Sequence, residues 1–198
     1  KQFVNEVFAA YGETSYTNQL LEVLHAQVEA NDTYTEFFAA IMSYFFAEHG
    51  LLLIDAAYEP LRQLEVPFFA RLVEQNEPLA NSVVVQENAL VGAGYSRPLE
   101  AKAENANLFH VKDGGRYLLE RKDAFYFNGL GGIKLTEEQV LAEMTSHPER
   151  FSNNVVTRPL MQDYVFPVLA FVGGPGELAY WATLKPAFEL MEMQMPIF

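Results

Sequence analysis

The sequence contains no cysteine, which excludes a disulfide framework, a thiolate metal site and a cysteine nucleophile. Basic residues are also scarce, since 13 Lys and Arg stand against 26 Asp and Glu, for a formal net charge of −13. This charge repels phosphate backbones and anionic lipid, so we expect no nucleic-acid partner and no membrane partner. The longest apolar stretches, at 37–46 and 165–172, are too short and too interrupted to span a bilayer.

The 198 residues are 50% hydrophobic and 14% aromatic, enough to bury the core of one or two domains. The first residue is Lys1 rather than Met, and the segment 1–12 has the pattern of an amphipathic helix rather than of a signal sequence. The last residues, 195–198, resemble a buried strand that has only just begun. We therefore expect the sequence to be a piece of a longer polypeptide.

The first 50 residues show helical periodicity. Thr33 and Glu36 form a capping box that begins a third helix, and Gly50 is placed to end it in a left-handed conformation. The apolar run Leu51–Ile54 before Asp55 is typical of a central parallel strand. Asp55 could contact a ligand there or cap the following turn. The expected buried side of the third helix consists of Phe37, Phe38, Ile41, Tyr44 and Phe45.

In the middle of the chain the predicted secondary structure changes from helices to short strands. Pro67 suits the first turn of a helix with Phe68, Phe69, Leu72 and Val73 inward, whereas the segment 83–91 fits a helix or a strand equally well. Short runs at 107–111, 116–120 and 124–128 predict an antiparallel meander with turns at 113–115 and 122–123. A second capping box, 136–139, begins a helix that Pro148 closes.

The last quarter predicts a helix at 158–166, a strand at 168–172, a helix at 176–193 and a strand at 196–198. A strand, helix, strand unit makes a right-handed crossover between parallel strands. Together with Leu51–Ile54, this unit predicts an α/β fold with a parallel sheet, to which the meander and the first helices are additions.

The loop Gly173-Gly174-Pro175-Gly176-Glu177 joins the predicted strand to a helix, where open parallel sheets bind ligands. It matches neither the dinucleotide fingerprint nor the P-loop, and Glu177 places a negative charge where a phosphate would lie. Three interpretations stay open: a tight turn with Glu177 complementing the helix dipole, a loop facing a cationic or neutral ligand, and a phosphate cradle.

Arg158 and Gln162 lie four residues apart and share a helix face. A guanidinium beside an amide can orient a carboxylate, as an amino-acid substrate needs, although Arg158 could instead pair with Asp163 or Glu177 to tie elements together. Histidines 25, 49, 110 and 147 lack metal-ligand spacing, and we expect each at the surface or at a helix end. No serine occupies a nucleophile elbow, so no catalytic residue is identified.

Two strings, 152–164 and 171–181, closely resemble the bacillithiol biosynthesis cysteine-adding enzyme family, as do 50–55 and 64–69. The resemblance covers essentially the whole chain and places it in the middle of such an enzyme. It implies a Rossmann-like parallel sheet with helical and small antiparallel β insertions. The implied parts are a helical segment at 1–50, a Rossmann-like strand plus helices at 51–104, a connecting-peptide-like meander and helix at 105–150, and a Rossmann-like half at 151–198.

The resemblance implies a ligase that adds cysteine to glucosaminyl malate, acting in the cytoplasm as a homodimer. It leaves open whether the complete enzyme uses a nucleotide, and it assigns no cofactor or metal to this portion, which we expect to be inactive alone. The alternative is a non-catalytic α/β module that binds a partner or a small molecule. The residues that we expect to bind substrate are Asn154, Arg158, Gln162, Asp163, Gly173, Gly174, Gly176, Glu177 and Tyr180.

Overall fold

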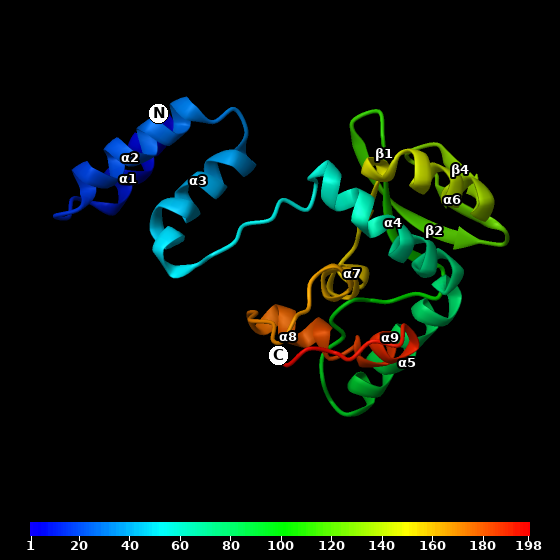
Figure 1. Ribbon diagram of the computed structural model, residues 1–198. Coiled ribbons are helices and arrows are strands. Elements are labelled where there is room, and N and C mark those ends of the chain that lie inside the picture. Colours follow the sequence, from blue (N-terminus) through cyan, green and yellow to red (C-terminus); the bar gives the residue numbers. More distant parts are fainter. The chain divides into compact units, whose positions relative to one another are not determined.

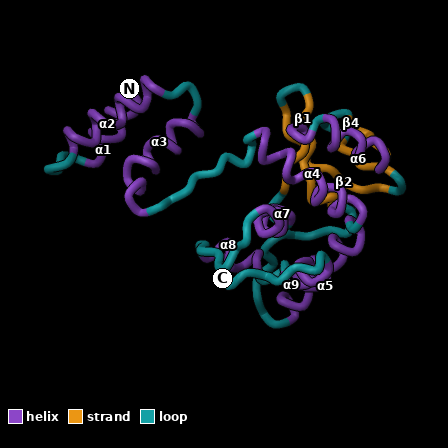
Figure 2. The backbone as a smooth tube through the Cα atoms, viewed as in Figure 1, coloured by secondary structure: helices purple, strands orange, loops and turns teal.

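The computed structural model describes residues 1–198, which form two compact units, residues 1–56 and residues 57–198 (Figure 1). The first unit is helical, and the second combines helices with one β-sheet (Figure 2). None of the helices is both long enough and apolar enough to cross a membrane.

The first unit contains α1 (Gln2–Tyr11), α2 (Thr17–Ala30), α3 (Tyr34–Phe46) and a short 3-10 turn (Ala47–His49). Helix α1 packs on α2, and α2 packs on α3. The predicted capping box is confirmed, because Thr33 Oγ1 accepts from the Glu36 N–H at 3.2 Å and Glu36 Oε2 accepts from the Thr33 N–H at 3.0 Å. Gly50 has φ 71°, which confirms the predicted left-handed residue after the helix.

Two predictions for the first unit are wrong. The expected buried side of α3 is not buried, and Phe38, Tyr44 and Phe45 are exposed. Leu51–Ile54 forms no strand, and all four of its side chains are exposed. A strand exists only through hydrogen bonds to a neighbouring strand, and no strand in the structure pairs with this segment.

The second unit begins with α4 (Glu59–Glu74) and α5 (Asn76–Gly92). The prediction that Pro67 lies in a first turn is wrong, because Pro60 lies there and Pro67 is inside α4. A proline inside a helix costs one backbone hydrogen bond, which the packing of the neighbouring phenylalanines offsets. The predicted inward residues Phe68, Phe69, Leu72 and Val73 are all buried, and the ambiguous segment 83–91 is helical.

The predicted meander is confirmed and extended to a five-stranded antiparallel sheet of order β4-β3-β2-β1-β5. Asp113 and Gly114 join the first two strands, and both have positive φ, 49° and 75°, as tight hairpin turns require. The strands are β1 (Asn105–Lys112), β2 (Gly115–Lys122), β3 (Phe125–Asn128), β4 (Ile133–Thr136) and β5 (Phe151–Asn153).

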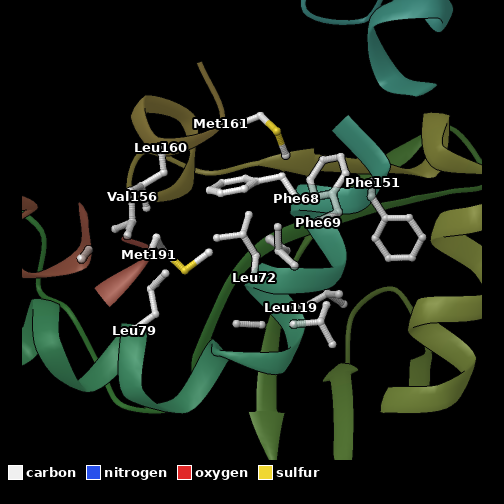
Figure 3. Close-up of a cluster of buried hydrophobic side chains, with 14 of the residues drawn as sticks. Phe68, Phe69, Leu72, Leu79, Leu119, Phe151, Val156, Leu160, Met161 and Met191 are labelled. Carbon is white, nitrogen blue, oxygen red and sulfur yellow. The ribbon is translucent and has the colours of Figure 1, made fainter. Parts of the chain in front are cut away.

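Helix α6 (Glu137–Ser146) follows β4 and packs against it and against α4. Its predicted capping box is confirmed, since Thr136 Oγ1 accepts from the Gln139 N–H at 3.3 Å and Gln139 Oε1 accepts from the Thr136 N–H at 2.8 Å. The main core lies between helices and sheet, where Figure 3 shows Phe68 and Phe69 between Met161 and Phe151. This core anchors α7 (Thr157–Val165) through Leu160 and Met161, which are both buried.

The last quarter departs from the predicted parallel sheet. The segment 168–172 makes a single parallel bridge, Ala170 with Ile197, in which Phe171 N–H donates to Ile197 O at 2.7 Å. The predicted helix 176–193 is two short helices, α8 (Pro175–Trp181) and α9 (Lys185–Leu190). They separate at Thr183, whose buried hydroxyl donates to Tyr180 O at 2.6 Å and tightens the turn. The two segments lie parallel at this one bridge, and the predicted parallel sheet is not confirmed.

Glu87 on α5 is fully buried and organises the loop before β1. Its carboxylate accepts from the N–H groups of Leu99 at 2.7 Å and of Glu100 and Ala101 at 2.9 Å each, and Arg97 pairs with it at 2.8 Å. Burial raises the pKa of Glu87, but the amide bonds and Arg97 outweigh burial and hold the pKa below its ordinary value. A charged carboxylate therefore stabilises this loop.

We expect Glu87→Gln to lower the free energy of unfolding by about 1–3 kcal/mol, because the amide turns an N–H donor toward backbone donors. A depressed pKa contributes stability above the ordinary carboxyl pKa of 4.5, and this contribution is lost as pH falls through the folded-state pKa. Urea unfolding from about pH 3 to about pH 7, a range around the ordinary carboxyl pKa, measures both effects. The variant should show a shallower loss of stability at acid pH, and equal pH profiles would contradict this role.

Candidate functional site

Arg158, on the first turn of α7, is the centre of a small polar cluster. Its Nη1 donates to Gln162 Oε1 at 2.9 Å, and its Nη2 donates to the Tyr180 hydroxyl at 2.7 Å. The prediction that Arg158 and Gln162 share a helix face is therefore confirmed. The alternative pairing with Asp163 or Glu177 is wrong, because neither carboxylate forms an ion pair with Arg158. The guanidinium is held in place by neutral groups and keeps its positive charge uncompensated.

An aromatic stack supports the guanidinium. The Arg158 Cζ lies 5.3 Å from the centroid of the Phe171 ring, which stacks on Trp181 with centroids 4.5 Å apart. Trp181 is buried, so the stack is fixed to the core of the second unit. Because Phe171 is near the end of the segment 168–172, Arg158 lies near the carboxyl end of the bridged segment.

Helix α7 is positioned by a network at its start. Asn154 Oδ1 accepts from the N–H groups of Val156 and Thr157 at 2.9 and 3.1 Å, and its Nδ2 donates to Asn107 Oδ1 at 2.9 Å. The Thr157 hydroxyl donates to Asn107 O at 2.8 Å. Asn107 has φ 56° within an irregularity of β1, which lets it face both partners. Asn154 was expected to bind substrate. In the structure its side chain forms hydrogen bonds that position α7, the helix that carries Arg158.

The loop 173–177 leads into α8. At Gly174 its geometry favours the interpretation as a tight turn. Glu177 Oε2 accepts from the Gly174 N–H at 3.1 Å, so a backbone amide that a phosphate would need is already bonded. An added Cβ at Gly173 would lie 2.8 Å from both Glu177 Oε2 and Phe171 Cε1, whereas Gly174 and Gly176 have open space. Glu177 and Tyr180 lie three residues apart on α8 and share one side of it.

Asp163 lies apart from this cluster, toward the amino end of the segment 168–172. Its carboxylate accepts from the Val168 N–H, and burial raises the pKa of Asp163 despite that bond. It lines a cavity of about 500 Å³ together with residues 167–169 and 194–197. Asp163 forms no ion pair with Arg158, and its expected role in substrate binding stays a prediction.

A second cavity of about 450 Å³ lies beside α6, and His110 lines it. His110 is only 5% exposed, so the expectation of a surface histidine is wrong, and its Nε2 lies 3.3 Å from Glu143 Oε2. Two other charged residues of the lining, Arg150 and Lys112, have partners within the protein. Arg150 pairs with Glu143 at 2.7 Å, and Lys112 Nζ donates to Gly131 O and Gly132 O at 3.1 and 3.2 Å. Lys112, like Arg158, is held by neutral oxygens, so this cavity also carries positive charge without a carboxylate partner.

Of the residues expected to bind substrate, the structure brings Arg158, Gln162 and Tyr180 into direct contact. Glu177, Gly173 and Gly174 precede Tyr180 on the same loop and helix. The stacked rings of Phe171 and Trp181 were not predicted from the sequence to be part of the site. Their sequence signal is weak, because an aromatic residue in an apolar strand is ordinary core until a cation is found above it.

A model of the family described as "Bacillithiol biosynthesis BshC, N-terminal Rossmann-like domain" matches residues 1–198. Its description names an N-terminal domain, whereas the resemblance had placed the chain in the middle of the enzyme. Three relatives are each named "Putative cysteine ligase BshC". The Lysinibacillus sphaericus protein is 49% identical over 100% of this chain, the Shouchella clausii protein 43% over 98%, and the Geobacillus kaustophilus protein 42% over 99%. The chain spans 36–37% of the length of these relatives.

Proposed function

This chain belongs to the BshC family of bacillithiol biosynthesis, and we propose that it is part of a cysteine ligase. The substrates would be cysteine and glucosaminyl malate, which the family resemblance implies. The complete enzyme would act in the cytoplasm as a homodimer on these small molecules. Within it, residues 151–198 would contribute one wall of the substrate pocket, and the parallel bridge of Ala170 and Ile197 would belong to a Rossmann-like sheet.

One observation carries the proposal for this chain: Arg158 is held by two neutral partners and has no carboxylate. A guanidinium has five N–H donors, and two of them make the bonds to Gln162 and Tyr180. The others can form a paired, charge-assisted contact with a carboxylate of a substrate. Both proposed substrates carry a carboxylate, so the group that Arg158 offers fits their chemistry.

Glu177 supplies the opposite charge on the neighbouring helix. Its Oε2 accepts from the Gly174 N–H, which fixes the side chain at the start of α8. Its Oε1 can accept from a substrate ammonium or hydroxyl group. In this arrangement Arg158 orients a carboxylate, Glu177 receives a donor, and Gly174 lets the ligand approach the backbone because its side has open space.

Turnover assays test the proposal. We expect the full-length polypeptide to convert cysteine and glucosaminyl malate to a thiol product that mass spectrometry detects, and the 198-residue chain alone to form none. The reason for the second expectation is that the chain spans only 36–37% of its relatives' length. A full-length protein without this activity would refute the function, and product from the short chain alone would refute its dependence on the rest.

A further inference from the structure

The cavity beside α6 is built entirely by the second unit and is separate from the cluster around Arg158. Its lining comes from β1, β4, α6 and the 3-10 turn Pro148–Arg150, and no residue of the Arg158 cluster contributes to it. Its volume of about 450 Å³ lies within the range of small-molecule sites, about 300–1,000 Å³. The cavity is therefore large enough to hold a small ligand.

The lining of this cavity is positively charged in a strongly acidic chain. Three basic and two acidic residues line it, a formal net charge of +1 where the whole chain has −13. One of the two carboxylates is turned toward the protein, because Glu143 Oε1 accepts from Arg150 at 2.7 Å and Glu143 Oε2 lies 3.3 Å from His110 Nε2. Burial raises the pKa of Glu143, but Arg150 and His110 outweigh burial and hold that pKa below its ordinary value. Glu143 is thus a charged, compensated carboxylate.

Hydrogen-bond donors remain on the basic residues of the lining. An ammonium group has three N–H donors, and Lys112 uses two of them on Gly131 O and Gly132 O. Arg150 has five, of which one bonds to Glu143. His110 is only 5% exposed, and its Nδ1 is buried without a hydrogen-bond partner. Buried polar groups are paired in most proteins, so a group bound in this cavity can supply the missing partner.

We propose that this cavity binds a small oxyanion, a phosphate or carboxylate group, at a site distinct from that of Arg158. Lys112 supplies a point charge that no carboxylate neutralises, and Arg150 supplies planar N–H donors. A protonated imidazole donates from both nitrogens, so His110 can direct Nε2 at Glu143 and use Nδ1 for the ligand. This inference concerns a second binding site and does not depend on the ligase activity.

Calorimetric titration of the full-length protein tests the site, with inorganic phosphate and succinate as separate probes. Sodium chloride keeps the ionic strength constant, because salt screens exposed charges. We expect at least one probe to bind with a Kd on the order of 1 mM or below. Tighter binding of phosphate would assign a phosphoryl group to the ligand, and tighter binding of succinate a carboxylate. Arg158→Ala should leave this affinity unchanged, because Arg158 does not line the cavity. If neither probe bound saturably, the proposal would be refuted.

Charge-removing variants of the full-length protein locate the bound anion. Lys112→Gln should weaken its binding by about 10-fold, since a hydrogen bond to a charged group contributes at least that factor. Arg150→Gln should also weaken binding, and it decides the question alone if the loss of the Lys112 bonds to Gly131 and Gly132 unfolds the protein. Lys122→Gln is the matched control, because it removes the same charge from β2 without lining the cavity. Unchanged affinity in Arg150→Gln and in folded Lys112→Gln, or an equal loss in Lys122→Gln, would overturn the proposal.

Discussion

Arg158→Ala in the full-length enzyme is expected to lower kcat/KM by a factor on the order of 100, while the melting temperature falls by only a few degrees. Removing one partner of a charge-assisted contact costs about 2–5 kcal/mol, and each 1.4 kcal/mol corresponds to about a factor of ten. The folded protein alone loses two hydrogen bonds, to Gln162 and Tyr180, worth about 1 kcal/mol each. Steady-state kinetics and thermal unfolding separate the two effects.

Two further variants make the Arg158 result specific. Arg158→Lys keeps the charge but loses the planar fork, so we expect an intermediate loss of activity. Arg71→Ala is the control, because Arg71 also donates one bond to a protein oxygen, Met191 O at 2.9 Å, without contacting the cluster. It should lower stability and leave kcat/KM nearly unchanged. If Arg158→Ala and Arg71→Ala changed activity equally, Arg158 would have only a structural role.

Gly174→Val is expected to abolish measurable turnover and leave the fold intact. Gly174 has φ −81°, which any residue adopts, and an added Cβ there meets no atom within 4 Å. The valine would instead occupy the space that we assign to substrate. Replacing Gly at a helix start with an apolar residue costs about 1 kcal/mol of stability, so circular dichroism should show a folded enzyme.

Two other glycines control for the backbone effect. Gly173→Ala should lower stability, because its Cβ would lie 2.8 Å from Glu177 Oε2 and Phe171 Cε1. Gly92→Val, at the end of α5, also meets open space and lies outside the cluster, so turnover should persist. Normal turnover by Gly174→Val would show that no ligand approaches this loop.

Local signals in the sequence were sufficient where the neighbouring residues determine the structure. The capping boxes at Thr33 and Thr136 and the turn at Asp113 were predicted because each satisfies backbone groups within four residues. The pair of Arg158 and Gln162 followed from helical spacing for the same reason. These predictions required no knowledge of distant parts of the chain.

Sequence patterns did not predict the structure correctly where it depends on residues that are distant in the sequence. Leu51–Ile54 has the composition of a central strand, yet it has no strand to pair with in residues 1–198. Histidine is a residue type that we expected at the surface, but β5 and α6 bury His110 against Phe151 and Glu143. The contact between Arg158 and Phe171 joins segments 13 residues apart and depends on how α7 packs. Such contacts could not be predicted from periodicity.

A crystal structure of the full-length enzyme with cysteine and glucosaminyl malate tests the central claim most directly. We predict that a substrate carboxylate lies about 2.7–2.9 Å from the Arg158 guanidinium, the usual length of a charge-assisted hydrogen bond, and beside the loop 173–177. Substrates bound elsewhere, with Arg158 contacting only Gln162 and Tyr180, would contradict the claim.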